Sequence, residues 1–184
     1  PRIVHCDEKE NFKLTPEKLE AAIGPKTKAF LFCSPSNPTG LMYSSEELLA
    51  FANIFKKHPK VIILSDDIYN RLVFDPARRV HGVAPHILHV APELKDQVVM
   101  INGGSKAFSM TGWRIGWATG PQKLITAMAD YQSQSTGAAS SIAQHAVLAA
   151  LSDCDADIEA VNRKLLERKK FAMNEFKRIP QFKI

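Results

Sequence analysis

The stretch TKAFLFCSPSNPTGLMYSSEELLAFANIFKKHPKVIILSDDIY, residues 27–69, decides the fold. It opens with an apolar run at residues 27–34 and closes with another at residues 60–67. Short apolar runs bounded by turn residues predict buried strands. Between them, residues 44–58 begin with two serines and then repeat apolar side chains at helical spacing, which predicts a capped amphipathic helix. This succession indicates two parallel strands of an α/β sheet.

The same alternation continues on both sides of this stretch. Further strands are expected at residues 2–6 and 97–104, and further helices at residues 15–23, 124–134, 140–152 and 155–179. Residues 75–96 are irregular and rich in proline, so we expect a surface excursion there. The predicted fold class is α/β, a mostly parallel sheet with helices on both faces.

Composition and charge narrow the function classes. The chain of 184 residues is 45% hydrophobic and 23% charged, which is typical of a soluble globular protein. No apolar run is long enough to cross a bilayer, and no signal peptide is visible, so no membrane association is predicted. The net charge of +5 indicates a solvated basic surface. Aromatic residues are not interleaved with the basic run near the end, so nucleic-acid binding is not predicted.

The cysteines indicate the redox compartment. Cys6, Cys33 and Cys154 are odd in number and widely spaced, which argues against a disulfide framework and against a paired-cysteine metal site. We therefore expect reduced thiols and a cytoplasmic protein. The three histidines in residues 81–89 lack the spacing of a structural zinc site. We therefore expect His81, His86 and His89 on a surface loop and predict no metal.

Chemically suggestive segments follow three of the predicted strands. SPSNPTG spans residues 34–40, SDDIY spans residues 65–69, and INGGSKAFSMTGWRIGWATGP spans residues 101–121. In open parallel sheets, ligands bind at the carboxyl ends of the strands. We therefore expect the three segments to converge on one site.

The first two segments leave several interpretations open. Asn37 lies in a proline-fixed turn, where its amide can bond its own backbone or face a ligand. Asp66 and Asp67 could cap a helix or hold Mg²⁺, although no further acidic cluster supports a metal. Alternatively, one of these acids holds a cation-like ring nitrogen while Tyr69 donates a hydrogen bond nearby.

Lys106 is the most unusual residue of the third segment. It follows two glycines and precedes small and aromatic residues, and an apolar setting makes a lysine amine nucleophilic. A phosphate-binding P-loop needs an earlier glycine that is absent here. Arg114 could hold a phosphate with two parallel hydrogen bonds. A solvated surface lysine would explain neither the glycines nor the tryptophans.

In this order and at these separations, the three motifs resemble the signatures of the class I/II aminotransferases. These are pyridoxal-phosphate enzymes of fold type I, and the resemblance extends over essentially the whole chain, including residues 15–40 and 132–151. It is closest to the bacterial-type aspartate aminotransferase subgroup. The resemblance implies a partial large α/β/α domain, amino-acid and 2-oxo-acid substrates of the aspartate/2-oxoglutarate kind, and a homodimer.

The resemblance also gives the residues their roles. Lys106 would form the Schiff base with pyridoxal 5'-phosphate and then move the proton between the substrate Cα and the cofactor. Asp66 would pair with the pyridine nitrogen, which keeps the ring an electron sink. Tyr69 would act at the ring's phenolic oxygen. These three residues form the expected catalytic set.

The remaining cofactor contacts follow in the same way. Asn37 would share the phenolic oxygen, Ile68 would lie against one face of the ring, and Arg114 would hold the phosphate. Many relatives carry a serine three residues before the lysine as a phosphate ligand, and Gly103 stands there in this chain. We therefore expect Ser105 to supply the hydroxyl instead.

Full-length members of the family are much longer, so the resemblance makes this chain a central fragment. Residues 1–154 would form part of the large cofactor-binding domain, and residues 155–184 a linking helix and the start of the small domain. The arginine for the substrate carboxylate and the aromatic that stacks on the cofactor would lie elsewhere, so we expect the fragment alone to be inactive. The alternatives are another fold-type-I enzyme, such as a β-lyase or an aminocyclopropane-carboxylate synthase-like protein, and a non-catalytic degenerate domain.

Overall fold

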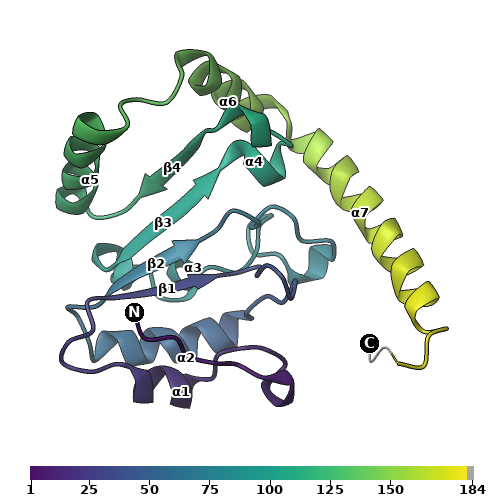
Figure 1. The fold of residues 1–184 in the computed structure, drawn as a ribbon, viewed down its shortest axis with the longest axis horizontal. Coiled ribbons are helices and arrows are strands. Elements are labelled where there is room, and N and C mark those ends of the chain that lie inside the picture. The colour runs from purple at the N-terminus through teal and green to yellow at the C-terminus, as the bar shows by residue number, and fades with distance from the viewer. Residues whose placement is uncertain (182–184) are drawn as a thin grey trace.

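The centre of the structure is a four-stranded sheet. The computed structural model describes residues 1–181. The strands are β1 (Ala29–Cys33), β2 (Ile62–Asp66), β3 (Val98–Gly103) and β4 (Gly116–Thr119), and they lie side by side in that order (Figure 1). The first three are parallel, and β4 runs antiparallel to β3. The predicted mostly parallel α/β fold is confirmed.

Seven α-helices accompany the strands in the described residues. They are α1 (Pro16–Ala22), α2 (Ser45–Lys56), α3 (Ile87–Val90), α4 (Gly104–Ala107), α5 (Gln122–Ser135), α6 (Ser141–Asp153) and α7 (Asp155–Phe176). The sequence signals at two of their starts act as expected. The Thr15 side chain accepts a hydrogen bond from the Lys18 amide, and Ser44 forms a reciprocal capping box with Glu47.

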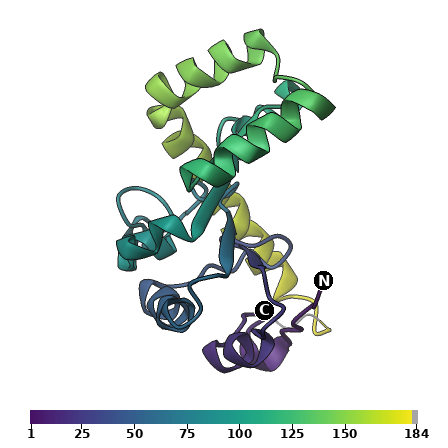
Figure 2. The same ribbon diagram turned by 90° about the vertical axis from the view of Figure 1, so that its left-hand side faces the viewer.

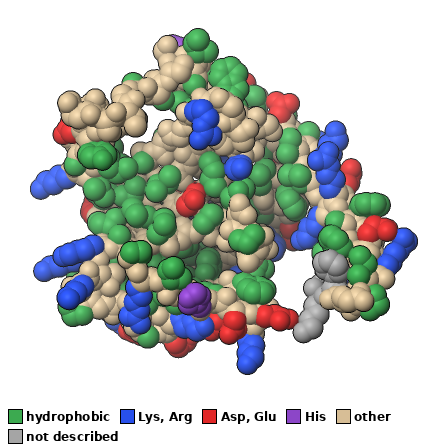
Figure 3. All heavy atoms as spheres, viewed as in Figure 1, with side chains coloured by type: hydrophobic (Ala, Val, Ile, Leu, Met, Phe, Trp, Pro, Cys, Tyr) green, Lys and Arg blue, Asp and Glu red, His purple; other side chains and the backbone are tan. Residues whose placement is uncertain are grey.

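One face of the sheet carries the main hydrophobic core. Phe30 stacks on Phe32 at 5.3 Å between ring centroids, and Phe30 meets Phe55 of α2 at the same distance. Helices α1, α2 and α3 contribute to this core together with the strand residues Ile63 and Val98 and with Leu94, and Figure 2 shows α2 and α3 on one side of the strands. On the opposite face Leu31 is 67% exposed, and hydrophobic side chains gather over the sheet in Figure 3. Within residues 1–181, the helical layer over this second face is incomplete.

Two sequence predictions are wrong. Residues 2–6 form no strand, because no described strand lies beside them to complete a ladder. The prediction of a surface excursion over residues 75–96 fails for residues 84–94, because Ile87, Ala91 and Leu94 are buried in the main core, whereas residues 75–83 are exposed or half-buried. Ile87, Ala91 and Leu94 follow one another at intervals of four and three residues, which is helical spacing. Prolines divide the segment into helices too short to be recognised from the sequence.

Of the three C-terminal helices, α6 packs beside the start of β4, and α7 extends away from the sheet (Figure 1). Val147 of α6 packs against Met110 and Ile115, and α7 projects beyond the body of the molecule (Figure 1). At the start of α7, the buried Asn162 side chain donates a hydrogen bond to the Arg71 carbonyl at 2.9 Å. Further along α7, Phe171 is 69% exposed. Of the predicted segment 155–184, residues 182–184 lie outside the described residues. Among residues 1–181, no helix combines the length and hydrophobicity that a membrane span requires.

Candidate active site

The three predicted segments meet at one edge of the sheet. Because β1, β2 and β3 are parallel, their carboxyl ends lie side by side, with Cys33 in register with Asp66 and Asp66 in register with Ile101. The loops that leave these ends carry the candidate residues. The prediction that the segments converge is confirmed by this register.

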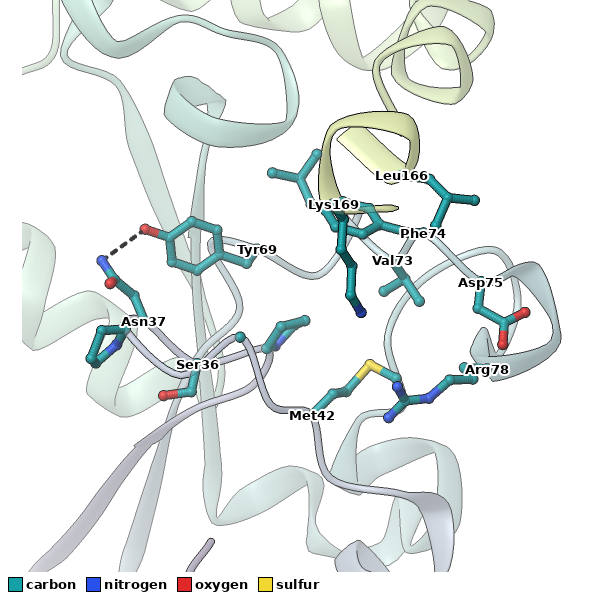
Figure 4. A pocket seen from close by; sticks show the side chains of 14 residues that line it. Ser36, Asn37, Met42, Tyr69, Val73, Phe74, Asp75, Arg78, Leu166 and Lys169 are labelled. Carbon is teal, nitrogen blue, oxygen red and sulfur yellow. Dashed lines mark hydrogen bonds between the residues drawn. The ribbon is translucent and has the colours of Figure 1, made fainter. Parts of the chain in front are cut away.

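Asn37 and Tyr69 join the first two loops. The Asn37 Nδ2 group donates a hydrogen bond to the Tyr69 hydroxyl at 3.3 Å, and Figure 4 shows both side chains at the end of a cavity. Gly40 adopts a φ of 68°, and its amide donates to the Ser36 carbonyl at 2.7 Å. This turn closes the loop, so the Asn37 amide faces Tyr69 rather than its own backbone.

Lys106 brings the third loop to the same tyrosine. Its Nζ atom lies 5.7 Å from the centroid of the Tyr69 ring, within the range of a cation–π contact. The Lys106 side chain is exposed, whereas its neighbours Gly104 and Ala107 are buried. The apolar setting that the sequence indicates therefore belongs to the backbone that carries the lysine. The amine itself is accessible.

Gly103 has no space for a side chain. A Cβ atom there would lie 2.9 Å from the Ile115 carbonyl oxygen and 3.3 Å from Cδ1 of Ile68. A serine at this position would therefore require β4 to shift relative to β3. The next hydroxyl, on Ser105, is partly buried in the first turn of α4. Ser105 therefore stays the candidate for a phosphate contact.

The two aspartates point to opposite faces of the sheet. Asp66 shares the less covered face with Leu31, and its Oδ1 atom accepts a hydrogen bond from the Ile68 amide at 3.2 Å. Asp67 is 4% exposed and accepts a 2.7 Å hydrogen bond from the Ser65 hydroxyl. Neither aspartate caps a helix in the described residues. Asp66 is thus the acid presented to a ligand at this edge.

Asp67 faces His86, and the prediction that His86 lies on a surface loop is wrong, because His86 caps the start of α3 and its side chain is 11% exposed. The Asp67 Oδ2 atom lies 3.5 Å from the His86 Nε2 atom. Burial raises the pKa of Asp67 to about 7, with a further contribution from Asp66, and burial lowers the pKa of His86 to about 4. His86 is therefore neutral at physiological pH, and the contact is not an ion pair. No group of three metal-ligating side chains occurs within residues 1–181.

The hydrogen bond of Arg114 lies within its own turn. The residue adopts a left-handed φ of 49°, and its exposed guanidinium donates from Nη1 to the Thr111 carbonyl at 3.0 Å. The structure thus joins Asn37, Tyr69 and Lys106 by contacts. It leaves the phosphate role of Arg114 a prediction.

A cavity of about 460 Å³ opens beside the Asn37–Tyr69 pair. Arg78 and Lys169 line its other end, and Figure 4 shows Lys169 reaching in from α7. Sequence reasoning missed both of these basic residues and the buried His86. Only tertiary packing brings Lys169 to the site, a hundred residues after Tyr69, and no local pattern signals such a contact.

Comparison with known proteins supplies the family context. The sequence model for aminotransferase class I and II matches residues 1–184. The aspartate aminotransferase of Geobacillus stearothermophilus is 45% identical over 182 residues, which cover 99% of this chain and 45% of that protein. The aspartate/prephenate aminotransferase of Cereibacter sphaeroides is 50% identical over 159 residues, 86% of this chain and 38% of that protein.

A solved structure agrees with these sequence matches. The crystal structure of the aspartate aminotransferase from Rhizobium meliloti superposes with a TM-score of 0.84 at 41% sequence identity, covering 92% of this chain and 41% of that one. The chain thus spans less than half the length of the relatives it matches.

Proposed function

The chain belongs to the class I and II aminotransferase family, and from this premise we propose that the full-length protein is a pyridoxal-phosphate-dependent aminotransferase. It transfers an amino group from an aspartate-like amino acid to a 2-oxo acid. The observation that carries the proposal is the meeting of three loops at Tyr69. Its hydroxyl accepts a hydrogen bond from Asn37, and its ring lies beneath the Lys106 amine.

The donor set of this edge fits pyridoxal 5'-phosphate. An accessible amine, a carboxylate and a phenol lie on three neighbouring loops, as an aldehyde, a ring nitrogen and a ring oxygen require. We assign these partners to Lys106, Asp66 and Tyr69. When bound, the cofactor supplies an electron sink for the substrate Cα–H bond.

The remaining contacts orient the ring and the phosphate. Ile68 lies close to Gly103 and between the Asp66 and Tyr69 positions, where its side chain can pack on one face of a ring. Ser105 and Arg114 are the candidates for the phosphate. The absence of a side chain at Gly103 lets a ligand approach the end of β3 closely.

Lys106 is the residue that we assign to proton transfer. Its exposed Nζ atom can reach a ligand, and in the free-amine form it can accept a proton from a substrate Cα and return it. Asp66, as a carboxylate, holds a proton on the ring nitrogen. Tyr69 would donate a hydrogen bond from its hydroxyl to the ring oxygen, while Asn37 keeps that hydroxyl oriented.

The substrate assignment comes from the relatives. Two of them are named as aspartate or aspartate/prephenate aminotransferases, so we propose an acidic amino-acid substrate of the aspartate type. We place the groups that bind the substrate carboxylate and stack on the cofactor in the part of the full-length protein that this chain does not span.

Domain organisation and assembly are further parts of the proposal. We assign residues 1–154 to the cofactor-binding domain and the segment from Asp155 to a link toward a second domain, because α7 begins there and leaves the body. We also propose a homodimer, supported by the exposed apolar side chains Ile142 and Leu148 on α6. The three free cysteines suit a reducing cytoplasm.

The test compares wild-type full-length protein with Lys106→Ala, using Lys26→Ala as the control. Purified protein is loaded with pyridoxal 5'-phosphate and given aspartate and 2-oxoglutarate. We expect oxaloacetate and glutamate from the wild type and from Lys26→Ala, and a loss of at least a thousandfold in kcat for Lys106→Ala. Release of pyruvate, ammonia and sulfide from cysteine, with no glutamate formed from aspartate and 2-oxoglutarate, would show a β-lyase instead. Unchanged turnover in Lys106→Ala would overturn the assignment.

A further inference from the structure

A buried pair lies behind the site, on the covered side of β2. Asp67 follows Asp66 directly, but its side chain faces the core, where it contacts His86 at the start of α3. Their side chains are 6% and 11% exposed, respectively. Burying two titratable side chains together costs free energy unless each finds a partner. The burial of Asp67 beside His86 therefore calls for a functional explanation.

The hydrogen bonds of His86 fix its tautomer. Its Nδ1 atom accepts a hydrogen bond from the Leu88 amide at 3.1 Å, so in the neutral ring the proton is on Nε2. The buried Nε2 atom has no hydrogen-bond partner among the described residues, and the Asp67 carboxyl lies 3.5 Å away. The imidazole N–H group thus lies beside the Asp67 carboxyl without forming a hydrogen bond to it.

Asp67 is also tied by its backbone to the other parts of the site. Its amide donates to the Ile101 carbonyl of β3 at 2.8 Å, and its carbonyl accepts from the Asn70 amide at 2.9 Å. The Asn70 side chain in turn accepts a hydrogen bond from Asn102 at 3.2 Å. The Asp67 backbone therefore helps to join the Asp66–Tyr69 turn to the strand that leads to Lys106.

We propose that Asp67 and His86 form a positioning pair that sets the orientation and the charge environment of Asp66, and thereby the protonation of a cofactor ring held by Asp66. The inference rests on the proposed function. Neither residue touches the ligand, because both lie on the covered side of β2. They act through Asp66, one residue away on the opposite face.

The charges around the pair determine the direction of the effect. Asp66 of β2 faces the site, and the Cys33 thiol of β1 stays uncharged because burial raises its pKa to about 11. On the α3 side, burial lowers the pKa of His89, and His81 adds to that shift. An ionised Asp67 is thus a second negative charge close to Asp66. Negative charge stabilises a nearby protonated cation, so Asp67 raises the pH at which the bound cofactor loses its proton.

The test uses the full-length protein loaded with pyridoxal 5'-phosphate. The visible absorption of the bound cofactor is titrated from pH 5 to pH 9 in wild type, Asp67→Asn, His86→Asn and His81→Asn. Asn at position 86 can still cap α3 through its side-chain oxygen, but it removes the imidazole N–H. His81 has a φ of 51°, which Asn tolerates, so His81→Asn is the matched control.

We expect the absorbance midpoint to fall by about 0.5 to 1 pH unit in Asp67→Asn and to fall in His86→Asn, with no change in His81→Asn. Loss of the His86 N–H group keeps Asp67 protonated to higher pH, so both variants shift the midpoint in the same direction. Asp67→Asn keeps the size and shape of the side chain and decides the matter alone if His86→Asn does not fold.

A purely structural role predicts a different result. In that case Asp67→Asn would lower the melting temperature or the cofactor affinity, measured by equilibrium dialysis, and leave the midpoint unchanged. That outcome would overturn the inference and leave the proposed function intact. Wild-type protein that shows no visible band with the cofactor would overturn the proposed function and the inference with it.

Discussion

The Asn37 amide donates a hydrogen bond to the Tyr69 hydroxyl at 3.3 Å, and this bond joins the loop after β1 to the loop after β2. The two residues are 32 positions apart in the chain. Their contact orients the phenol toward the space above β2, where Lys106 also arrives. The Tyr69 hydroxyl therefore joins the two loops and also has a role in the proposed chemistry.

Replacing Tyr69 with Phe tests this double role. The ring under Lys106 remains, but the hydroxyl that Asn37 orients is lost. We expect kcat of the full-length enzyme to fall by about tenfold, because a hydrogen bond of roughly 1.4 kcal/mol to the cofactor disappears. The control is Tyr131→Phe, since Tyr131 is 78% exposed on α5. Equal rates in the two variants would exclude Tyr69 from the reaction.

Gly103→Ala tests the close packing between β3 and β4. The added Cβ atom would lie 2.9 Å from the Ile115 carbonyl oxygen, so β4 must shift. We expect the free energy of unfolding to fall by about 1–3 kcal/mol, measured by urea denaturation. Gly24→Ala is the matched control, because nothing lies within 4 Å of a Cβ atom there. If Gly103→Ala and Gly24→Ala had similar free energies of unfolding, the carboxyl end of β3 would have room for a side chain.

The buried Asp67 predicts a pH dependence of stability. Its pKa is raised from 3.8 to about 7 in the folded protein, so the unfolded chain loses this proton first. The stability that the protonated group contributes is full below pH 4 and is lost as the pH rises through 7. We expect Asp67→Asn to gain about 2–4 kcal/mol relative to wild type between pH 4 and pH 7.5.

His86 makes the opposite contribution. Its pKa is lowered from 6.5 to about 4, so its stabilisation is present above pH 6.5 and is lost as the pH falls through 4. Because His86 contacts Asp67, the comparison is repeated with His86→Asn in both proteins, which removes this contribution. Urea midpoints at half-unit pH steps provide the measurement. A constant difference across the range would contradict the raised pKa of Asp67.

Local signals explain what could be predicted from the sequence. Apolar runs marked β1, β2 and β3, and Thr15 and Ser44 marked the starts of α1 and α2. Parallel strands then forced Asn37, Asp66 and Lys106 onto one edge. This step needed only the rule that loops at the carboxyl ends of parallel strands lie together.

What could not be predicted depends on distant partners. Strand β4 has four residues and begins with Gly116, so its pairing with β3 gave no periodic signal. The apolar residues 2–6 lack a neighbouring strand in the described chain. His86 became a partner of Asp67 only because Ile87 buries its helix in the core. Each of these features is decided by packing between segments far apart in the sequence.

The docking of α7 gives the last prediction. Asn162 is 2% exposed, and its Nδ2 atom donates to the Arg71 carbonyl, two residues after Tyr69. Removing the amide in Asn162→Ala leaves that carbonyl without the hydrogen bond from α7 and opens a gap beside it. We expect a loss of about 1–3 kcal/mol in the free energy of unfolding and faster proteolysis within α7, with Asn53→Ala as the exposed control. If α7 were held by its ion pairs to Arg71 and Arg79 alone, Asn162→Ala would match the control, and 0.5 M salt would loosen the helix instead.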